Sequence, residues 1–302
     1  KMKNERLLSL RNQMKEAGVH CMVIPTSDYH NSEYVSDFFM ARKYFSGFTG
    51  SAGTLVVTPD EAALFTDGRY FIQAAKELKD SGITLMKMGE PEVPTMTEYV
   101  DQKLQQGWTL CFDGRVLTSS KGSELEEIVR KHGGQLRFDL DLCDTAWENR
   151  PALIHHPVFV LSEEYAGESV EEKLTETREK MTKDGANALL LTKLDDLMWL
   201  FNIRGCDVEC NPVAMSYAYI TEDTATLFIQ QKALDTQVSE YLAAHHIDVK
   251  EYDTVVDFLK SLPAGNAILV DNRYCSYTLY KTLQKNQHLI EGKNPTELLK
   301  AI

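Results

Sequence analysis

Apolar positions near the start of the chain recur at the spacing of a helix. Leu7, Leu8, Met14 and Ala17 fall at roughly helical intervals, and Gly18 follows at the position expected of a C-cap. This pattern predicts an amphipathic helix whose apolar face packs on a core.

Short apolar runs alternate with helical segments and predict strands. The ranges 21–25, 54–58 and 62–66 are such runs, and the turn Pro59-Asp60-Glu61 joins the last two as a hairpin. A helix over 70–78, a strand over 110–112 and a helix over 121–131 follow. Because hairpins coexist with strand–helix crossovers, we predict an α/β protein with mixed sheets.

The same residues return in the second half of the chain. Four residues of the first helix, Leu7, Arg11, Met14 and Gly18, have counterparts at one constant offset in Leu174, Arg178, Met181 and Gly185. The strand over 62–65 is echoed over 225–228, and Asp113-Gly114-Arg115 is echoed by Asp271-Asn272-Arg273. We therefore predict one α/β domain that has been duplicated, at a period far longer than that of solenoid repeats.

A stretch rich in Asp, Pro and His separates the two halves. This stretch, 139–157, has the composition of a linker. We place the first domain at 1–158 and the second, related domain at 159–302, each a mixed β-sheet flanked by helices.

Composition and charge exclude several functional classes. The net charge is −13 and no Lys/Arg cluster is present, which disfavours binding to nucleic acid or to an anionic membrane. The longest apolar runs, such as Leu197–Phe201, are far shorter than the roughly 20 residues that span a bilayer, and the charged start Lys1–Arg6 does not match a signal peptide. The six cysteines are scattered, which favours a reducing, cytoplasmic location.

A glycine cluster over 47–53 resembles a phosphate-binding loop only superficially. No Gly-Lys-Ser/Thr follows, and the next predicted element is a strand and not the N-terminus of a helix. We interpret these glycines as permitting a close approach of the backbone at a turn.

The sequence Asp67-Gly68-Arg69 is a candidate site. Asp67 can cap the helix that begins near Tyr70, and Gly68 can supply the turn. Arg69 opposes the dipole of that helix, and residues that break a local rule are expected at functional sites. From these residues alone, the favoured explanation is an Arg69–Asp67 ion pair that steadies the turn.

The remaining candidates favour structure over catalysis. Asp113/Arg115 and Asp271/Arg273 occur in both halves, as a duplicated architecture would have them. Four patterns could suggest a metal, namely Cys206 with Cys210, His155-His156, His245-His246 and the acidic stretch 139–144, but none has the spacing of a zinc or calcium site. We therefore expect no catalytic residue and no metal ligand in this chain.

Several long motifs resemble those of Xaa-Pro aminopeptidases (aminopeptidase P). Residues 31–34, 45–54 and 66–71 resemble the first domain of that family; residues 194–205, 207–208 and 211–213 resemble its second domain; and Trp147 with Arg150-Pro151 resembles its inter-domain stretch. The resemblance covers essentially the whole chain in order. It implies tandem domains of the creatinase/prolidase N-terminal type, which have a ribonuclease H-like motif.

In that family a third, "pita-bread" domain carries the chemistry. A dinuclear site, usually manganese, is built there from two Asp, one His and two Glu, and a bridging hydroxide attacks the peptide bond before proline. These 302 residues stop about where that domain would begin. The resemblance thus implies the N-terminal part of a cytoplasmic, dimeric hydrolase (a metalloprotease) that is inactive without its C-terminal catalytic domain.

One residue role carries over from the family. Arg69 matches the arginine that reaches from the first domain toward a peptide substrate with proline in second position, and Asp67 and Gly68 would support it. Two alternatives stay open: a stand-alone binding or dimerisation module, and a relative of prolidase or creatinase. The second is disfavoured because those relatives usually carry one such domain.

Overall fold

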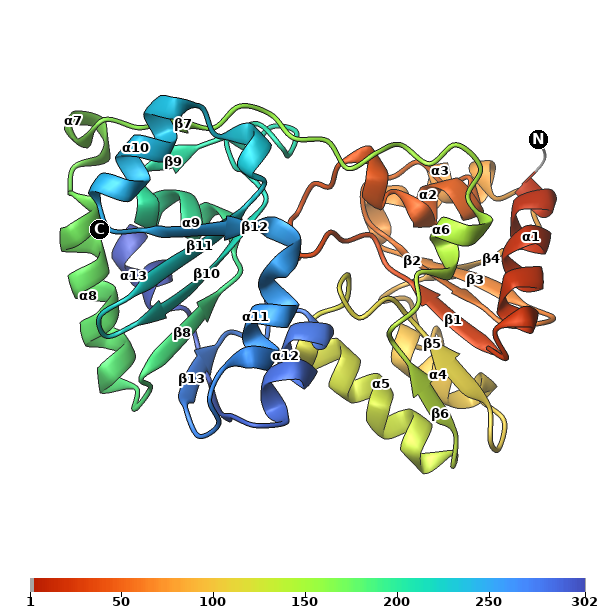
Figure 1. Ribbon diagram of the computed structural model, residues 1–302. Helices are drawn as coiled ribbons and strands as arrows, with labels where there is room; N and C mark the ends of the chain where they lie inside the picture. The colour runs from red at the N-terminus through yellow and green to blue at the C-terminus, as the bar shows by residue number, and fades with distance from the viewer. Residues whose placement is uncertain (1–2, 302) are drawn as a thin grey trace. The chain divides into compact units, whose positions relative to one another are not determined.

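The computed structural model describes residues 3–301 and divides them into two compact units (Figure 1). The first unit contains the chain up to Tyr29 and Asp37–Ala152, and the second contains His30–Ser36 and the chain from Leu153 on. Within residues 3–301, every helix is too short or too polar to traverse a bilayer.

The first unit is built on a six-stranded mixed sheet in the order β4-β3-β2-β1-β5-β6. Strands β1, β2 and β3 are antiparallel neighbours, whereas β3 with β4, β1 with β5, and β5 with β6 run parallel. The strands are β1 (Cys21–Ile24), β2 (Thr54–Val57), β3 (Ala62–Thr66), β4 (Thr84–Lys87), β5 (Thr109–Cys111) and β6 (Gln135–Arg137). The predicted hairpin is therefore confirmed as β2–β3.

The second unit repeats this sheet strand for strand. Its order is β12-β11-β10-β8-β13-β14, with the same alternation of antiparallel and parallel neighbours. The strands are β8 (Ala188–Leu191), β10 (Ser216–Thr221), β11 (Ala225–Ile229), β12 (Asp248–Glu251), β13 (Ala267–Val270) and β14 (His288–Glu291); β7 (Phe159–Val160) and β9 (Ile203–Arg204) form a separate antiparallel pair. The predicted α/β class with two related mixed sheets is confirmed.

Helices accompany both sheets (Figure 1). The first unit holds α1 (Lys3–Glu16), α2 (Ala41–Ser46), α3 (Phe71–Glu77), α4 (Met96–Lys103), α5 (Ser119–Lys131) and α6 (Leu142–Ala146). The second holds α7 (Glu163–Ala166), α8 (Val170–Lys183), α9 (Leu194–Phe201), α10 (Thr236–Ala244), α11 (Val255–Ser261), α12 (Tyr277–Gln284) and α13 (Pro295–Lys300). On α1 the core positions are Leu7, Leu10 and Met14, whereas Leu8 is exposed, so its assignment to the apolar face was wrong. The two neighbours Leu7 and Leu8 differ by about 100° around the helix, and only one of them can face the sheet.

One of the residues that recur at a constant offset between the two halves is an arginine with the same structural role in the first helix of each unit. Arg11 donates from Nε and Nη2 to the carbonyl oxygens of Thr58 and Glu61, at 3.0 and 2.9 Å, and so clamps the β2–β3 turn. Arg178 on α8 makes the same two bonds to the β10–β11 turn, at 2.7 and 3.0 Å. The repeated arginine is thus a repeated helix-to-hairpin clamp.

The predicted linker over 139–157 is partly folded, which corrects the interpretation of its start. Helix α6 lies within it and buries Leu142, Cys143 and Ala146 in the core of the first unit. Asp141 caps this helix by accepting a hydrogen bond from the backbone N–H of Asp144 at 3.1 Å. The aspartates that suggested a linker are therefore cap and ion-pair residues around a buried helix.

The segment His30–Ser36 belongs to the second unit although it lies early in the chain. The buried ring of His30 donates from Nδ1 to the Thr192 carbonyl at 2.8 Å, which leaves Nε2 to accept from the Tyr252 hydroxyl at 2.6 Å. Asn31 donates from Nδ2 to the carbonyl of Arg273 at 2.9 Å. This seven-residue insert is fixed at its start by hydrogen bonds to three separate parts of the second unit.

Candidate functional site

The predicted site residues form one compact turn at the end of β3. Asp67 accepts a bond from the backbone N–H of Arg69 at 3.1 Å and caps the short 3-10 helix Gly68–Tyr70. The Arg69 guanidinium donates back from Nε and Nη2 to the two carboxylate oxygens, both at 2.9 Å. These bonds lower the pKa of Asp67, which keeps its carboxylate ionised. We call the pair of bonds from one guanidinium to one carboxylate the fork.

The turn does not depend on a glycine for its conformation. A Cβ at Gly68 would lie 3.9 Å from the Phe71 ring, an ordinary contact, and the backbone there is not left-handed. In the turn of the same kind that follows β13, Asn272 stands between the aspartate and the arginine. The geometry of the turn therefore does not require glycine at position 68.

A buried arginine, which the sequence analysis missed, fixes the loop beside this turn. Arg42 donates from Nε to Thr26 Oγ1 at 2.9 Å, from Nη1 to the Phe48 carbonyl at 2.6 Å and from Nη2 to the Gly50 carbonyl at 2.5 Å. Burial lowers the pKa of Arg42 to about 10. The only sequence signal was an arginine five positions before the glycine cluster.

This loop in turn positions Tyr70, the residue after Arg69. The Tyr70 hydroxyl lies 2.5 Å from Ser51 Oγ, and the Tyr70 ring meets Phe48 edge-on at 5.7 Å between centroids. A Cβ at Gly50 would lie 2.3 Å from Phe48 and 2.8 Å from Tyr70, so this position requires glycine. Strand β2 follows at Thr54, in keeping with the interpretation of the cluster as a close backbone approach.

The same Asp-x-Arg turn occurs at the ends of three strands. Arg115 repeats the fork with Asp113 after β5, and Arg273 repeats it with Asp271 after β13, with all these bonds between 2.7 and 3.1 Å. These two arginines also reach second carboxylates: Arg115 lies 3.7 Å from Asp141, and Arg273 lies 2.7 Å from Glu297. The Arg69 side chain is 68% exposed, against 46% for each of the others. Of the three, Arg69 presents its guanidinium most openly to solvent.

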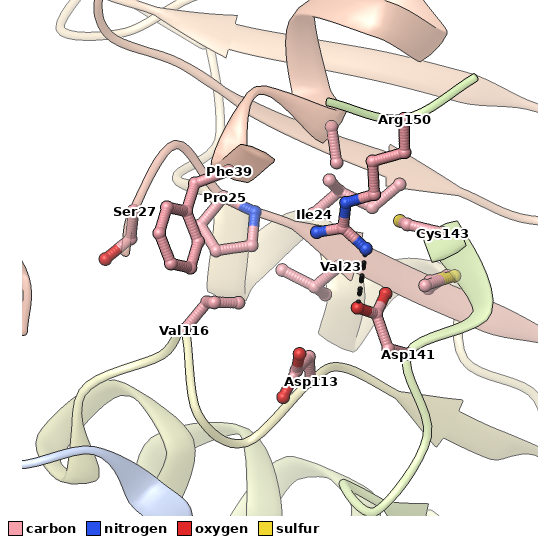
Figure 2. A pocket seen from close by; sticks show the side chains of 12 residues that line it. Val23, Ile24, Pro25, Ser27, Phe39, Asp113, Val116, Asp141, Cys143 and Arg150 are labelled. Carbon is pink, nitrogen blue, oxygen red and sulfur yellow. Dashed lines mark hydrogen bonds and ion pairs between the residues drawn. The ribbon is translucent and has the colours of Figure 1, made fainter. Parts of the chain in front are cut away.

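The acidic stretch 139–144 is neutralised by arginines. Asp141 lies 2.8 Å and Asp144 lies 3.1 Å from Nη1 of Arg150, and Asp139 pairs with Arg137 at 3.2 Å. Figure 2 shows Arg150 pointing down to Asp141 at the rim of a cavity of about 30 Å³ that Asp113 and Cys143 also line. That volume suits an ordered water and is too small for a peptide.

Each of the two histidine pairs has one member bonded to a carboxylate. His156 donates its backbone N–H to Asp207 at 2.9 Å, and His245 Nδ1 lies 2.5 Å from Glu171. Cys206 and Cys210 are exposed free thiols. Among residues 3–301, no three His, Cys, Asp or Glu side chains gather in a way that could hold a metal ion.

The two α/β units have the same strand order and the same arginine contact between the first helix and the hairpin. They are therefore two copies of one domain. Two models of the creatinase/prolidase N-terminal domain match the chain, one over residues 6–136 and the other over 149–302. The chain belongs to the creatinase/prolidase N-terminal domain family.

Relatives match nearly the whole chain. A "Probable Xaa-Pro aminopeptidase P" of Fusarium vanettenii is 39% identical over 98% of this chain and 50% of its own length, and one of Sordaria macrospora is 39% identical over 99% and 50%. The crystal structure of X-prolyl aminopeptidase from Caenorhabditis elegans, described as a cytosolic enzyme with a di-nuclear active site, superposes with a TM-score of 0.90 at 29% identity. It covers 97% of this chain and 50% of that chain. The chain thus spans about half the length of the relatives it matches, which are Xaa-Pro aminopeptidases.

Proposed function

We propose that this chain is the non-catalytic N-terminal part of an Xaa-Pro aminopeptidase. In full length such an enzyme removes the N-terminal residue from peptides with proline in second position. The observation that carries the proposal is the match of essentially the whole chain to aminopeptidases of about twice its length. The hydrolysis would depend on two divalent metal ions, manganese by family resemblance, held by a C-terminal catalytic domain.

The two units would then shape access to the catalytic centre. The first domain, 1–158, and the second, 159–302, would wall the substrate cleft, admit small unfolded peptides and contribute to a homodimer. The resemblance to a cytosolic enzyme and the acidic charge of the chain support a cytoplasmic protein that binds neither nucleic acid nor membrane.

Arg69 would provide the substrate contact of this half. A guanidinium carries five N–H donors in a planar fork, and the two bonds to Asp67 use one edge of it. The Asp67 fork holds the side chain in one orientation, so little rotamer entropy is lost when a peptide carboxylate or carbonyl binds. Its exposure, the highest of the three equivalent arginines, supports this assignment.

The proposal is tested first with the purified chain. An Xaa-Pro tripeptide with added Mn²⁺ should show no turnover, whereas a protein extended by the catalytic domain should hydrolyse it. Metal-dependent turnover by the chain alone that survives repurification would contradict the assignment as non-catalytic. A natural gene that ends near Ile302 would favour the stand-alone binding module instead.

The Arg69 role is tested in the full-length enzyme. Arg69→Ala should lower kcat/KM for tripeptides about 10- to 100-fold, the equivalent of a charge-assisted hydrogen bond of about 1.5–3 kcal/mol. Arg115→Ala removes the same kind of turn at another strand end and should leave kcat/KM near wild type. Equal kinetics of wild type and Arg69→Ala on every peptide length would refute the role.

A further inference from the structure

In each unit, the helix that follows the last strand of the sheet returns to an Asp-x-Arg turn. Helix α6 follows β6 and packs on α1, and α13 follows β14 and packs on α8, the counterpart of α1 (Figure 1). Arg115, in the turn after β5, lies 3.7 Å from Asp141, which caps α6. Arg273, in the turn after β13, donates from Nη2 to Glu297 of α13 at 2.7 Å. We call α6 and α13 the exit helices, and a contact with the exit helix is thus a shared role of these two turns.

The exit helix of the second unit is also bound by a buried carboxylate. Asp196, in the first turn of α9, is completely buried. Its Oδ2 accepts a hydrogen bond from Thr296 Oγ1 at 2.9 Å, and its Oδ1 accepts one from Lys300 Nζ at 2.6 Å. A buried carboxylate is costly unless a cation and hydrogen bonds compensate it, and here α13 supplies both. Detaching α13 therefore removes both compensating groups at once.

The anchors of α13 lie on two sides of this six-residue helix. Thr296 and Lys300 are four residues apart, so they face the same side, toward α9. Glu297 points about 100° further around the helix and binds the turn after β13. The backbone N–H of Asn294, just before the helix, donates to Asp271 Oδ2 of the same turn at 3.2 Å. Bonds in two directions oppose both the lifting and the rolling of α13.

Resting on the proposed function, we propose that α13 fixes the direction in which the chain continues from the second unit into the catalytic half. Asp196 and Lys300 are then positioning residues, because they act through α13. They hold the catalytic half in one orientation to the second unit and so keep the walls of the substrate cleft in register with the reacting centre. A connector that lifts or rolls would displace the walls, and a displacement of about 1 Å is enough to cost a large factor in activity.

The kinetics of the full-length enzyme on Ala-Pro-Ala test this inference. Lys300→Met removes the cation, but it also leaves Asp196 buried and unpaired, which endangers folding. The double variant Asp196→Asn/Lys300→Met removes both charges and is therefore the main test. It should raise KM about 10-fold, because displaced cleft walls bind the peptide less well. A variant that merely reduces the amount of folded enzyme lowers the apparent kcat and leaves KM unchanged.

Trypsin digestion of the full-length enzyme measures the docking of α13 without relying on activity. Lys293 is exposed and directly precedes the anchored Asn294. Cleavage after Lys293 requires the following residues to detach and extend into the protease. The double variant should be cut there about 10-fold faster than wild type, with the site identified by mass spectrometry.

Lys131→Met is the matched control. It removes an ammonium on α5 that lies 2.7 Å from Asp101 on α4, so it also breaks a lysine–aspartate pair between two helices. This control should change neither KM nor the cleavage rate after Lys293.

Two results would overturn the positioning role while the proposed function stands. One is an unchanged KM in the double variant, with or without a lower kcat. The other is cleavage after Lys293 at the wild-type rate, since α13 would then not depend on these anchors. Absence of Ala-Pro-Ala hydrolysis by the full-length wild type would overturn the proposed function itself.

Discussion

The buried guanidinium of Arg42 gives the sharpest stability prediction. Arg42→Ala removes the donors to the carbonyls of Phe48 and Gly50, both held inside the first unit. A buried acceptor left without a partner costs about 1–3 kcal/mol, so two cost about 2–6 kcal/mol. The lost cation–π contact with Phe48, at 4.8 Å, acts in the same direction, whereas relief from burying the charge opposes both. We expect a net loss of about 3 kcal/mol in the free energy of unfolding of the first unit.

Tryptophan fluorescence can report that unit separately. Trp108 and Trp147 lie in the first unit and Trp199 in the second, so a Trp199→Phe background limits the signal to the first. Urea denaturation of Arg42→Ala in this background should show an earlier midpoint with an unchanged slope. Arg6→Ala removes a more accessible arginine that makes one bond to the Tyr44 carbonyl, and it should cost about 1 kcal/mol. An Arg42→Ala midpoint within error of that of Arg6→Ala would refute the reasoning.

Two further predictions concern packing and pH. Gly134→Ala would place a Cβ 2.2 Å from the Trp108 carbonyl oxygen, so it should lower the free energy of unfolding of the first unit by about 1–3 kcal/mol in urea denaturation. Gly68→Ala should be nearly neutral, because a Cβ there makes only an ordinary contact. Equal urea midpoints for the two variants would contradict the packing argument. Lys173 is buried against the C-terminal end of α9, where its ammonium donates to the Trp199 carbonyl at 2.9 Å, and burial lowers its pKa from 10.5 to about 8. Because the unfolded chain binds this proton more tightly, the free energy of unfolding should rise between about pH 8 and 10.5, by at most about 1.4 kcal/mol per pH unit, relative to Lys173→Met. A pH profile of Lys173→Met parallel to that of wild type would exclude this linkage.

The pattern of apolar and turn residues predicted those elements whose stabilising contacts join residues close together in the sequence. The β2–β3 hairpin and the helix ended at Gly18 follow from apolar period and turn residues, and the Asp67–Arg69 pair follows from a two-residue spacing. The duplication was visible because Arg11 and Arg178 clamp equivalent turns and so occupy equivalent positions.

Contacts between distant segments account for what the pattern did not predict. Arg42 looks like a surface residue until Thr26 and the carbonyls of the glycine loop surround it. Helix α6 was not predicted because its capping and pairing aspartates resemble those of a linker, and because the whole helix is only five residues long. The lower exposure of Arg115 relative to Arg69 depends on neighbours from distant segments, such as Asp141 at the start of α6, which no local spacing encodes.

The insert His30–Ser36 has a consequence for the order of folding. Its bonds from His30 to Thr192 and Tyr252 join residues 162 and 222 positions apart, so these contacts close among the longest loops in the chain. During synthesis the insert leaves the ribosome long before Thr192 and Tyr252 have been made. The second unit can therefore complete its fold only after the last third of that unit has been synthesised. A chain started at Leu153 would lack these seven residues, and a faithful dissection of the second unit therefore requires the insert to be supplied, in cis or as a peptide.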